Sequence, residues 1–238
     1  MKSEQYSIEY GKISITFSVV RRKRKTLEIA VEPDSTVTIT APFSATAESI
    51  ASKVRKRAVW ILRQQRYFGQ FSPHTPERRY VPGETHLYLG RQYRLKVVKS
   101  ASGSVKLLRG HIVVQSTRPE ASEEARRLLD EWYGLRARLK FNDRLEVCLQ
   151  RFPQPASVLP SGLTIRAMQK RWGSMSKGRR LLLNRGLIRA PIDTIDYVIT
   201  HELCHIIEPS HSAKYYRALG RVMPDWEERK ERLERFLA

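Results

Sequence analysis

A helix with an enforced end constrains this chain more than any other stretch. Residues 191–208 start at a proline and are strongly apolar, and Glu208-Pro209 must end the helix, since proline lacks a backbone donor and disfavours helical geometry before it. His201 and His205 lie four residues apart, so both imidazoles project from one face about one turn apart. Glu202 lies beside them, about 100° around the helix. Two imidazoles at this spacing can bind one metal ion.

The third ligand depends on the break in the helix. A continuous helix would carry His211 about 80° away from His201, on the side opposite His205. Because Pro209 stops the helix, the chain can turn back and bring His211 to the metal, with a new helix over 212–219. Three neutral imidazoles leave a fourth position open to water, as in catalytic rather than structural zinc sites. The spacing therefore predicts one Zn²⁺ held by His201, His205 and His211.

The chemistry expected of this site is peptide-bond hydrolysis. Zinc would bring the pKa of its bound water toward about 7, and Glu202 would accept the proton as general base. The bare motif also arises by chance in unrelated helices, but burying three polar side chains on an apolar helix without a purpose would be costly. Glu227 or Glu228 as third ligand is the alternative, although their polar run favours a solvated helix with paired charges.

Other reactive or aromatic side chains near the motif favour packing over chemistry. Cys204 points about 60° away from His201 on the side opposite Glu202, which is typical of a packed thiol. The nearby tyrosines are more typical of core packing than of oxyanion stabilisation. We expect the remaining histidines to be surface residues. The tyrosines are Tyr197, Tyr215 and Tyr216, and the histidines are His74, His86 and His111.

The charge of the chain indicates a polyanionic partner. Its 44 Lys and Arg exceed its 24 Asp and Glu by 20. This excess is dispersed except for one dense block, Arg21, Arg22, Lys23, Arg24 and Lys25, which we expect at the tip of a hairpin, in contact with phosphates or simply solvated. A second functional hypothesis follows from the charge. The chain could be a nucleic-acid-associated factor with a structural or vestigial zinc site, or a protease recruited to DNA-bound proteins.

Periodicity indicates an α+β fold in two parts. We expect a β-rich N-terminal region over 1–118 and a zincin-like metallopeptidase region over 119–238, in which strands 163–168 and 180–184 form a hairpin beside the metal helix. The long helix from Pro119 to about Gln150 is expected to bury a stripe that includes Leu135 and Leu139. The sequence shows no internal repeat. The other expected elements are strands 13–19, 27–31, 37–40, 86–89, 93–97, 105–108 and 112–114, and a helix from Ser44 to about Phe68.

Composition excludes several protein classes. No stretch approaches the 18 or so apolar residues that a membrane span needs. The first six residues are polar and lack the apolar core of a signal peptide. Two cysteines, Cys148 and Cys204, imply no disulfide framework. We therefore expect a cytoplasmic protein that has no membrane partner.

These residues resemble the YgjP-like metallopeptidases, a bacterial family of the zincin clan, over nearly the whole chain. The resemblance implies a zinc peptidase with His201, His205 and His211 as ligands, Glu202 as base and a protein or peptide substrate. In its ligand spacing the family is similar to the SprT-like and Wss-type proteases. Met175 departs from the Cys that family members often carry there. The matching motifs are Arg21–Val31, Tyr80–Glu84, Leu87–Gly90, Arg171–Ser174, Ala190–Val198, His201–His205, Glu208-Pro209, His211-Ser212 and Met223–Trp226.

The segment Arg171, Trp172, Gly173 and Ser174 gains a possible role from this resemblance. In zincins an edge strand beside the active-site helix binds substrate by strand addition. A glycine in such a strand allows another backbone to approach closely. We therefore expect this segment to border the cleft. The alternative reading makes Trp172 a core anchor and Gly173 a bulge.

Overall fold

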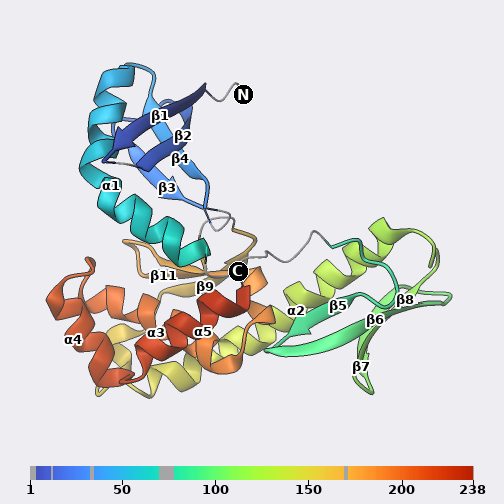
Figure 1. Ribbon diagram of the computed structural model, residues 1–238. Helices are drawn as coiled ribbons and strands as arrows, with labels where there is room; N and C mark the ends of the chain where they lie inside the picture. The colour runs from blue at the N-terminus through green and yellow to red at the C-terminus, as the bar shows by residue number, and fades with distance from the viewer. Residues whose placement is uncertain (1–3, 12, 33–34, 70–77, 169–170, 238) are drawn as a thin grey trace. The chain divides into compact units, whose positions relative to one another are not determined.

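The computed structural model describes residues 4–11, 13–32, 35–69, 78–168 and 171–237 and shows an α+β fold (Figure 1). The chain divides by its contacts into two compact units, residues 1–76 and 77–237. We call them unit 1 and unit 2. The boundary expected from the sequence lies after residue 118, so the contacts group the second set of strands with the C-terminal part of the chain.

Unit 1 is a four-stranded sheet with one long helix. The strand order is β1-β2-β4-β3, and β2 runs parallel to β4 while both outer pairs are antiparallel. Helix α1 begins after Thr46, whose Oγ1 accepts the Ser49 N–H, as the expected cap requires. Its apolar face, with Ile50 and Ile61, packs on Ile15 and Ile39 of the sheet. The elements are β1 (Glu4–Tyr10), β2 (Ile13–Arg22), β3 (Glu28–Val31), β4 (Val37–Pro42) and α1 (Ala47–Gly69).

The predicted hairpin with the basic block at its tip is wrong. Strand β2 continues through Arg22, so Arg21 and Arg22 belong to the strand itself. The following segment crosses over to β3, which pairs with β4 and not with β2. Alternation of apolar residues identifies a strand but not its partner, because either pairing buries the same face.

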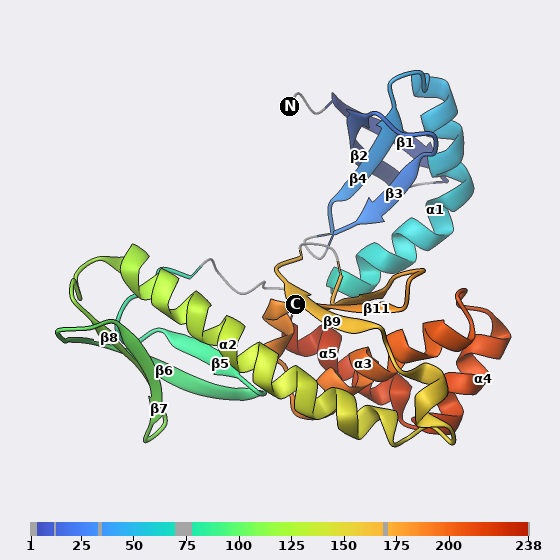
Figure 2. The same ribbon diagram turned by 180° about the vertical axis from the view of Figure 1, so that it is seen from behind.

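Unit 2 begins with a sheet that repeats the topology of unit 1. Its order is β5-β6-β8-β7, with a parallel β6–β8 pair between two antiparallel pairs, and a long helix, α2, follows (Figures 1 and 2). Helix α2 packs on this sheet through Leu128, Leu129 and Trp132. The elements are β5 (Thr85–Tyr88), β6 (Arg91–Lys99), β7 (Ser104–Leu108), β8 (His111–Ser116) and α2 (Ser122–Leu149).

The buried face of α2 differs from the predicted stripe. Leu135 and Leu139 are exposed, whereas Tyr133, Ala137 and Phe141 are buried. The Tyr133 hydroxyl donates to the Leu87 carbonyl of β5. The predicted stripe is therefore correct for Leu128, Leu129, Trp132 and Cys148, which are buried, and wrong for Leu135 and Leu139. Leucines that face solvent mislead a pattern whose buried face also uses tyrosine and alanine.

The rest of unit 2 is a small sheet and three helices. The sheet order is β10-β11-β9; β11 pairs parallel with β9 and antiparallel with β10. The hairpin predicted for 163–168 and 180–184 is therefore wrong, since the inserted β10 is the strand that turns back on β11. The elements are η1 (Pro155–Val158), β9 (Gly162–Arg166), β10 (Gly173–Met175), β11 (Arg180–Asn184), η2 (Arg185–Arg189), α3 (Ile192–Ile207), α4 (Ala213–Val222) and α5 (Trp226–Leu237).

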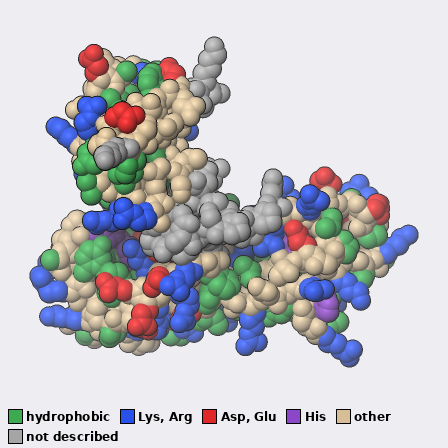
Figure 3. Space-filling model, viewed as in Figure 1, with side chains coloured by type: hydrophobic (Ala, Val, Ile, Leu, Met, Phe, Trp, Pro, Cys, Tyr) green, Lys and Arg blue, Asp and Glu red, His purple; other side chains and the backbone are tan. Residues whose placement is uncertain are grey.

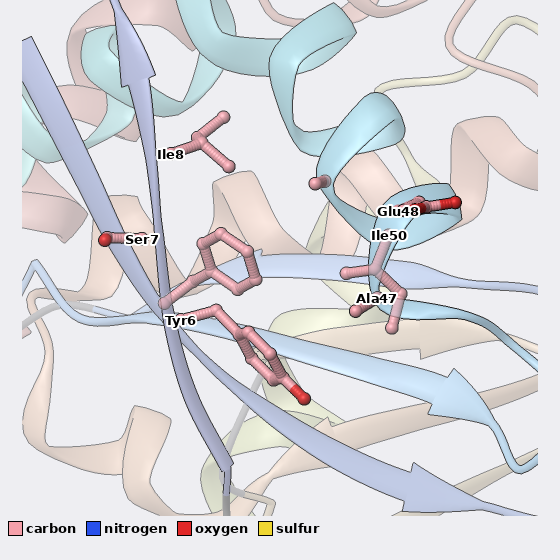
Figure 4. A pocket seen from close by; sticks show the side chains of 8 residues that line it. Tyr6, Ser7, Ile8, Ala47, Glu48 and Ile50 are labelled. Atoms are coloured by element: carbon pink, nitrogen blue, oxygen red, sulfur yellow. The ribbon is translucent and has the colours of Figure 1, made fainter.

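A shallow cavity in unit 1 lies between β1 and the start of α1 (Figure 4). Tyr6 and Ile8 of β1 and Ile50 of α1 line it. Its volume of about 230 Å³ is below that of most ligand pockets, and its lining is mostly apolar. We assign no ligand to it.

None of the described helices is long and apolar enough to cross a membrane.

Candidate metal centre

The metal-binding motif lies on α3, and the helix ends where the sequence predicts. The last helical residue is Ile207, and Glu208 caps the helix in an extended conformation. A new helix, α4, begins at Ala213, and the Ser212 hydroxyl accepts the Tyr215 N–H as its cap. The predicted break and restart are therefore confirmed. The connection between the two helices carries His211.

This break brings the three imidazoles of His201, His205 and His211 together. One ligand nitrogen from each lies within 4.8 Å of the other two. The Nε2 atoms of His211 and His201 are 3.1 Å apart. Nitrogen ligands at 2.0–2.1 Å around a tetrahedral zinc would be roughly 3.3 Å apart, so the spacing fits such an ion. The three histidines could hold one metal ion.

The protonation of the cluster also suits a metal. Burial, and then the proximity of His205 and His211, lower the pKa of His201 to about 3. Burial also lowers the pKa of His211. The Nδ1 atom of His205 lies 3.2 Å from the Glu208 carbonyl. A carbonyl can only accept, so Nδ1 is the protonated nitrogen and Nε2 is left free as a ligand.

Aromatic side chains support the cluster from α4. Tyr215 is fully buried, and its hydroxyl donates to the His201 carbonyl at 2.9 Å. Its ring stacks on His205 with a centroid distance of 4.6 Å. On the other side Tyr216 stacks on His211 and on Trp226, the first residue of α5. The expectation of packing is confirmed for Tyr215, but the sequence did not indicate that this packing would be against the imidazoles.

Glu202 is buried beside the histidines and contacts the edge strand β10. Only 7% of its surface is exposed. Burial raises the pKa of its carboxyl to about 7, while the Met175 backbone N–H and the charge of Arg171 act in the opposite direction. A Cβ on Gly173 would lie 2.8 Å from Glu202 Oε1 and 3.0 Å from Val198 Cγ1. Glycine is therefore required for this strand to approach α3 so closely.

Comparison with known proteins agrees with the site. A family model described as the YgjP-like metallopeptidase domain matches residues 25–236. The chain belongs to the YgjP-like metallopeptidase family. Neither the search of curated proteins nor that of solved structures found a match. A metallopeptidase family implies a bound metal, usually zinc, and the histidine cluster of this YgjP-like chain is compatible with it.

The segment expected to border the cleft lies next to the YgjP-like site. Gly173 and Ser174 belong to β10, which forms an edge of its sheet. Trp172 is half-buried, packs against the core, and accepts the Asn184 N–H through its carbonyl. Arg171 is exposed. Trp172 therefore serves as a core anchor, and its neighbour Gly173 lies beside α3.

A buried ion cluster fixes α3 of this YgjP-like metallopeptidase against α2. Asp196 is 3% exposed and accepts two hydrogen bonds from Arg144, at 2.8 and 2.7 Å, and one from Arg151 at 3.0 Å. The two cysteines, Cys148 and Cys204, are buried free thiols, as expected of packing residues. The sequence places Asp196 near the start of this helix but did not predict its pairing with Arg144 and Arg151, although an acid on a strongly apolar helix face is a usable signal.

The basic block belongs to unit 1, and the other described histidines are not members of the metal cluster. Arg21 donates to the Ala45 carbonyl and Arg24 to Glu28, so both hold local structure, while Arg22, Lys23 and Lys25 are exposed. On the face in Figure 3, Lys and Arg side chains are scattered over both units. The surface prediction is wrong for His86, which is buried, and agrees with the exposure of His111. His74 lies outside the described residues.

Proposed function

We propose that this chain is a zinc-dependent peptidase that hydrolyses peptide bonds in protein or peptide substrates. The observation that carries the proposal is the convergence of three imidazoles with a buried glutamate beside two of them. Membership of a metallopeptidase family supports it. Zn²⁺ bound by His201, His205 and His211 would polarise the scissile carbonyl and acidify a bound water. Three protein ligands are the number found in catalytic zinc sites.

Glu202 is the residue we assign to proton transfer. It is the carboxylate closest in sequence to the ligands and is held by α3 on one side and by the Met175 N–H on the other. A buried, oriented carboxylate can accept a proton from the attacking water and deliver it to the leaving amine. Its burial also keeps bulk water from competing for that proton.

Strand β10 is the surface that we assign to the substrate. It pairs with β11 along one side only, so its other side can add an extended peptide. An added strand at this edge would run beside α3, because Gly173 already contacts Glu202. Arg171, next to the strand, would contribute a positive charge at the rim. Arg171, Trp172, Gly173 and Ser174 together form the proposed substrate border.

The decisive experiment replaces Glu202 with Gln. We expect Glu202→Gln to abolish casein hydrolysis while zinc content, measured by metal analysis, stays at one ion per chain. Glu227→Gln is the matched control; Glu227 lies in the first turn of α5, outside the cluster, so activity and zinc should both be unchanged. Undiminished hydrolysis by Glu202→Gln would disprove the assigned role. Loss of zinc in Glu227→Gln would instead favour a glutamate as third ligand.

A second candidate is a peptidase recruited to DNA-bound proteins, or a nucleic-acid-associated factor whose zinc site is structural or vestigial. The net charge of +20 is the observation that favours it. Casein cleavage with and without added DNA, by wild type and His211→Ala, separates these possibilities. Casein cleavage that increases when DNA is added supports a peptidase recruited to DNA-bound proteins. DNA binding by a zinc-loaded wild type that hydrolyses no casein supports a nucleic-acid-associated factor.

A further inference from the structure

The outer face of α1 carries an excess of positive charge. The helix contains six cations and a single acid, Glu48. Among the described residues, none of these six cations forms a salt bridge. In α2 and α5, by contrast, Arg127 pairs with Glu131 and Arg235 with Glu231, each one turn away. The six cations of α1 are Lys53, Arg55, Lys56, Arg57, Arg63 and Arg66.

Four of these cations surround an exposed tryptophan. Lys53, Lys56, Arg57 and Arg63 lie within about 60° of Trp60 around the helix axis. We call these five residues the basic stripe. All are exposed, Trp60 by 39%. From its first to its last residue the stripe runs about 15 Å along the helix.

This face of α1 is exposed, whereas α2 buries the matching positions. The two sheets share one topology, and the two helices can be aligned on their first buried apolar residues, which matches Ile50, Val54 and Ala58 of α1 with Ala125, Leu129 and Tyr133 of α2. In this correspondence Lys53 and Arg57 occupy the positions of two buried residues of α2. Those residues are Leu128 and Trp132, which are 8% and 7% exposed. A position that is buried in one unit is cationic and exposed in the other.

We propose that the basic stripe binds single-stranded nucleic acid, with its cations on phosphates and Trp60 stacked on a base. Unpaired lysines and arginines release condensed counterions when they neutralise phosphates, which drives binding. An aromatic ring between such cations is the arrangement that holds unstacked bases. A membrane surface fits less well, because the apolar face of α1 is buried in unit 1 and cannot enter lipid. The proposal does not depend on peptide hydrolysis.

The test measures binding of the full chain to a labelled oligothymidylate of about 20 nucleotides by fluorescence anisotropy, between about 50 and 200 mM salt. We expect Lys53→Gln, Lys56→Gln and Arg63→Gln, combined, to lower the slope of log affinity against log salt by about 2, at 0.7 per lost phosphate contact. Glutamine keeps the helix propensity of lysine and arginine.

The matched control removes the same charge elsewhere. Arg94, Lys96 and Lys106 are exposed cations on the sheet of unit 2 that make no salt bridge among the described residues. Their combined change to Gln should leave the salt slope and the affinity unchanged. Equal losses in both triple variants would show that only net charge matters, and would overturn the proposal.

Trp60→Leu tests the stacking. We expect an affinity for the oligonucleotide at least about fivefold weaker, with an unaltered salt slope. Undiminished binding by this variant contradicts a single-stranded ligand, as does tighter binding to duplex DNA, polyglutamate or phosphatidylserine vesicles than to the oligonucleotide. Glu202→Gln should bind the oligonucleotide like wild type, so failure of the peptidase assignment and failure of this proposal can be told apart.

Discussion

At the scale of single residues, Gly173 allows β10 to approach Glu202 closely because it carries no side chain. A methyl group there would lie 2.8 Å from both Glu202 Cγ and Oε1. We expect Gly173→Ala to push the carboxylate aside and to lower kcat by about a hundredfold, since a displacement of about 1 Å costs that much. Zinc content should not change, because the three atoms nearest the added methyl belong to Glu202 and Val198 and not to a histidine.

Gly178→Ala is the control for this change. Gly178 lies in the turn between β10 and β11, and its nearest neighbour to an added Cβ is Ser176 Oγ at 3.9 Å. Its kcat should stay within about twofold of wild type, as expected for an unstrained surface change. A Gly173→Ala enzyme as active as Gly178→Ala would mean that the contact does not position Glu202.

We expect His86 to make the stability of unit 2 dependent on pH. Its ring is 1% exposed and lies 3.0 Å from Glu84 Oε2. Burial, then the charge of Arg78, lower its pKa to about 4. Between about pH 6.5 and 4 the unfolded chain is therefore protonated while the folded chain is not. As the pH is lowered from about 6.5 to 4, the free energy of unfolding should therefore decrease, by up to about 3 kcal/mol.

Urea unfolding followed by tryptophan fluorescence at about pH 7 and pH 5 measures this effect. Above about pH 6.5 the imidazole is neutral in both states, and the contribution disappears. His86→Gln keeps a hydrogen-bond donor for Glu84 but cannot titrate, so its stability should change less between the two pH values. The same pH dependence in both proteins would place the effect on other groups.

At the scale of elements, the ion cluster of Asp196 stabilises the packing of α3 against α2. Asp196 is buried and bound by Arg144 and Arg151, whereas Asp193, in the first turn of the same helix, pairs with Arg232 near the surface. We expect Asp196→Asn to lower the free energy of unfolding by about 3 kcal/mol, because it leaves two guanidinium groups without a carboxylate. Asp193→Asn should cost less than about 1 kcal/mol. Equal losses in urea unfolding would contradict this ranking.

The sequence predicted elements better than it predicted their neighbours. The strands and helices assigned from periodicity are largely present. The end of α3 at Glu208 was also predictable, because it depends only on the adjacent Pro209. The predicted pairings of β2 with β3 and of β9 with β11 as hairpins failed, since pairing depends on distant partners that share one buried face. Strand β1 was missed because only Ile8 of its seven residues is buried.

The candidate site also combines features that the sequence predicts with features that it does not. The convergence of His211 with the pair on α3 could be predicted, because helix periodicity and a proline determine it. The bond from Tyr215 to the His201 carbonyl and the salt bridges of Asp196 could not, because both join segments only through tertiary packing. Gly173 could be predicted only in part. Its place in the Arg171–Ser174 segment indicated that another backbone could approach it, but not that it would contact Glu202.

At the scale of the whole molecule, metal binding should stabilise unit 2, which contains all three histidines. Free zinc at about a hundred times its Kd should raise the free energy of unfolding by about 2.7 kcal/mol, and chelation should remove this gain. Thermal unfolding with and without zinc measures it. His211→Ala should lose most of the gain, while His111→Ala, an exposed histidine on β8, should keep it. Equal gains in both variants would exclude His211 as a ligand.

The helix break at Glu208 has a mechanical consequence. His201 and His211 are ten positions apart in the chain, yet their Nε2 atoms lie 3.1 Å from each other. An ion bound to both closes a ring through the end of α3 and the start of α4, as a short crosslink would. Unlike a disulfide, this crosslink opens when the ion leaves. The attachment of α4 to α3, and with it the position of the Tyr215 ring, would then depend on whether the metal is bound.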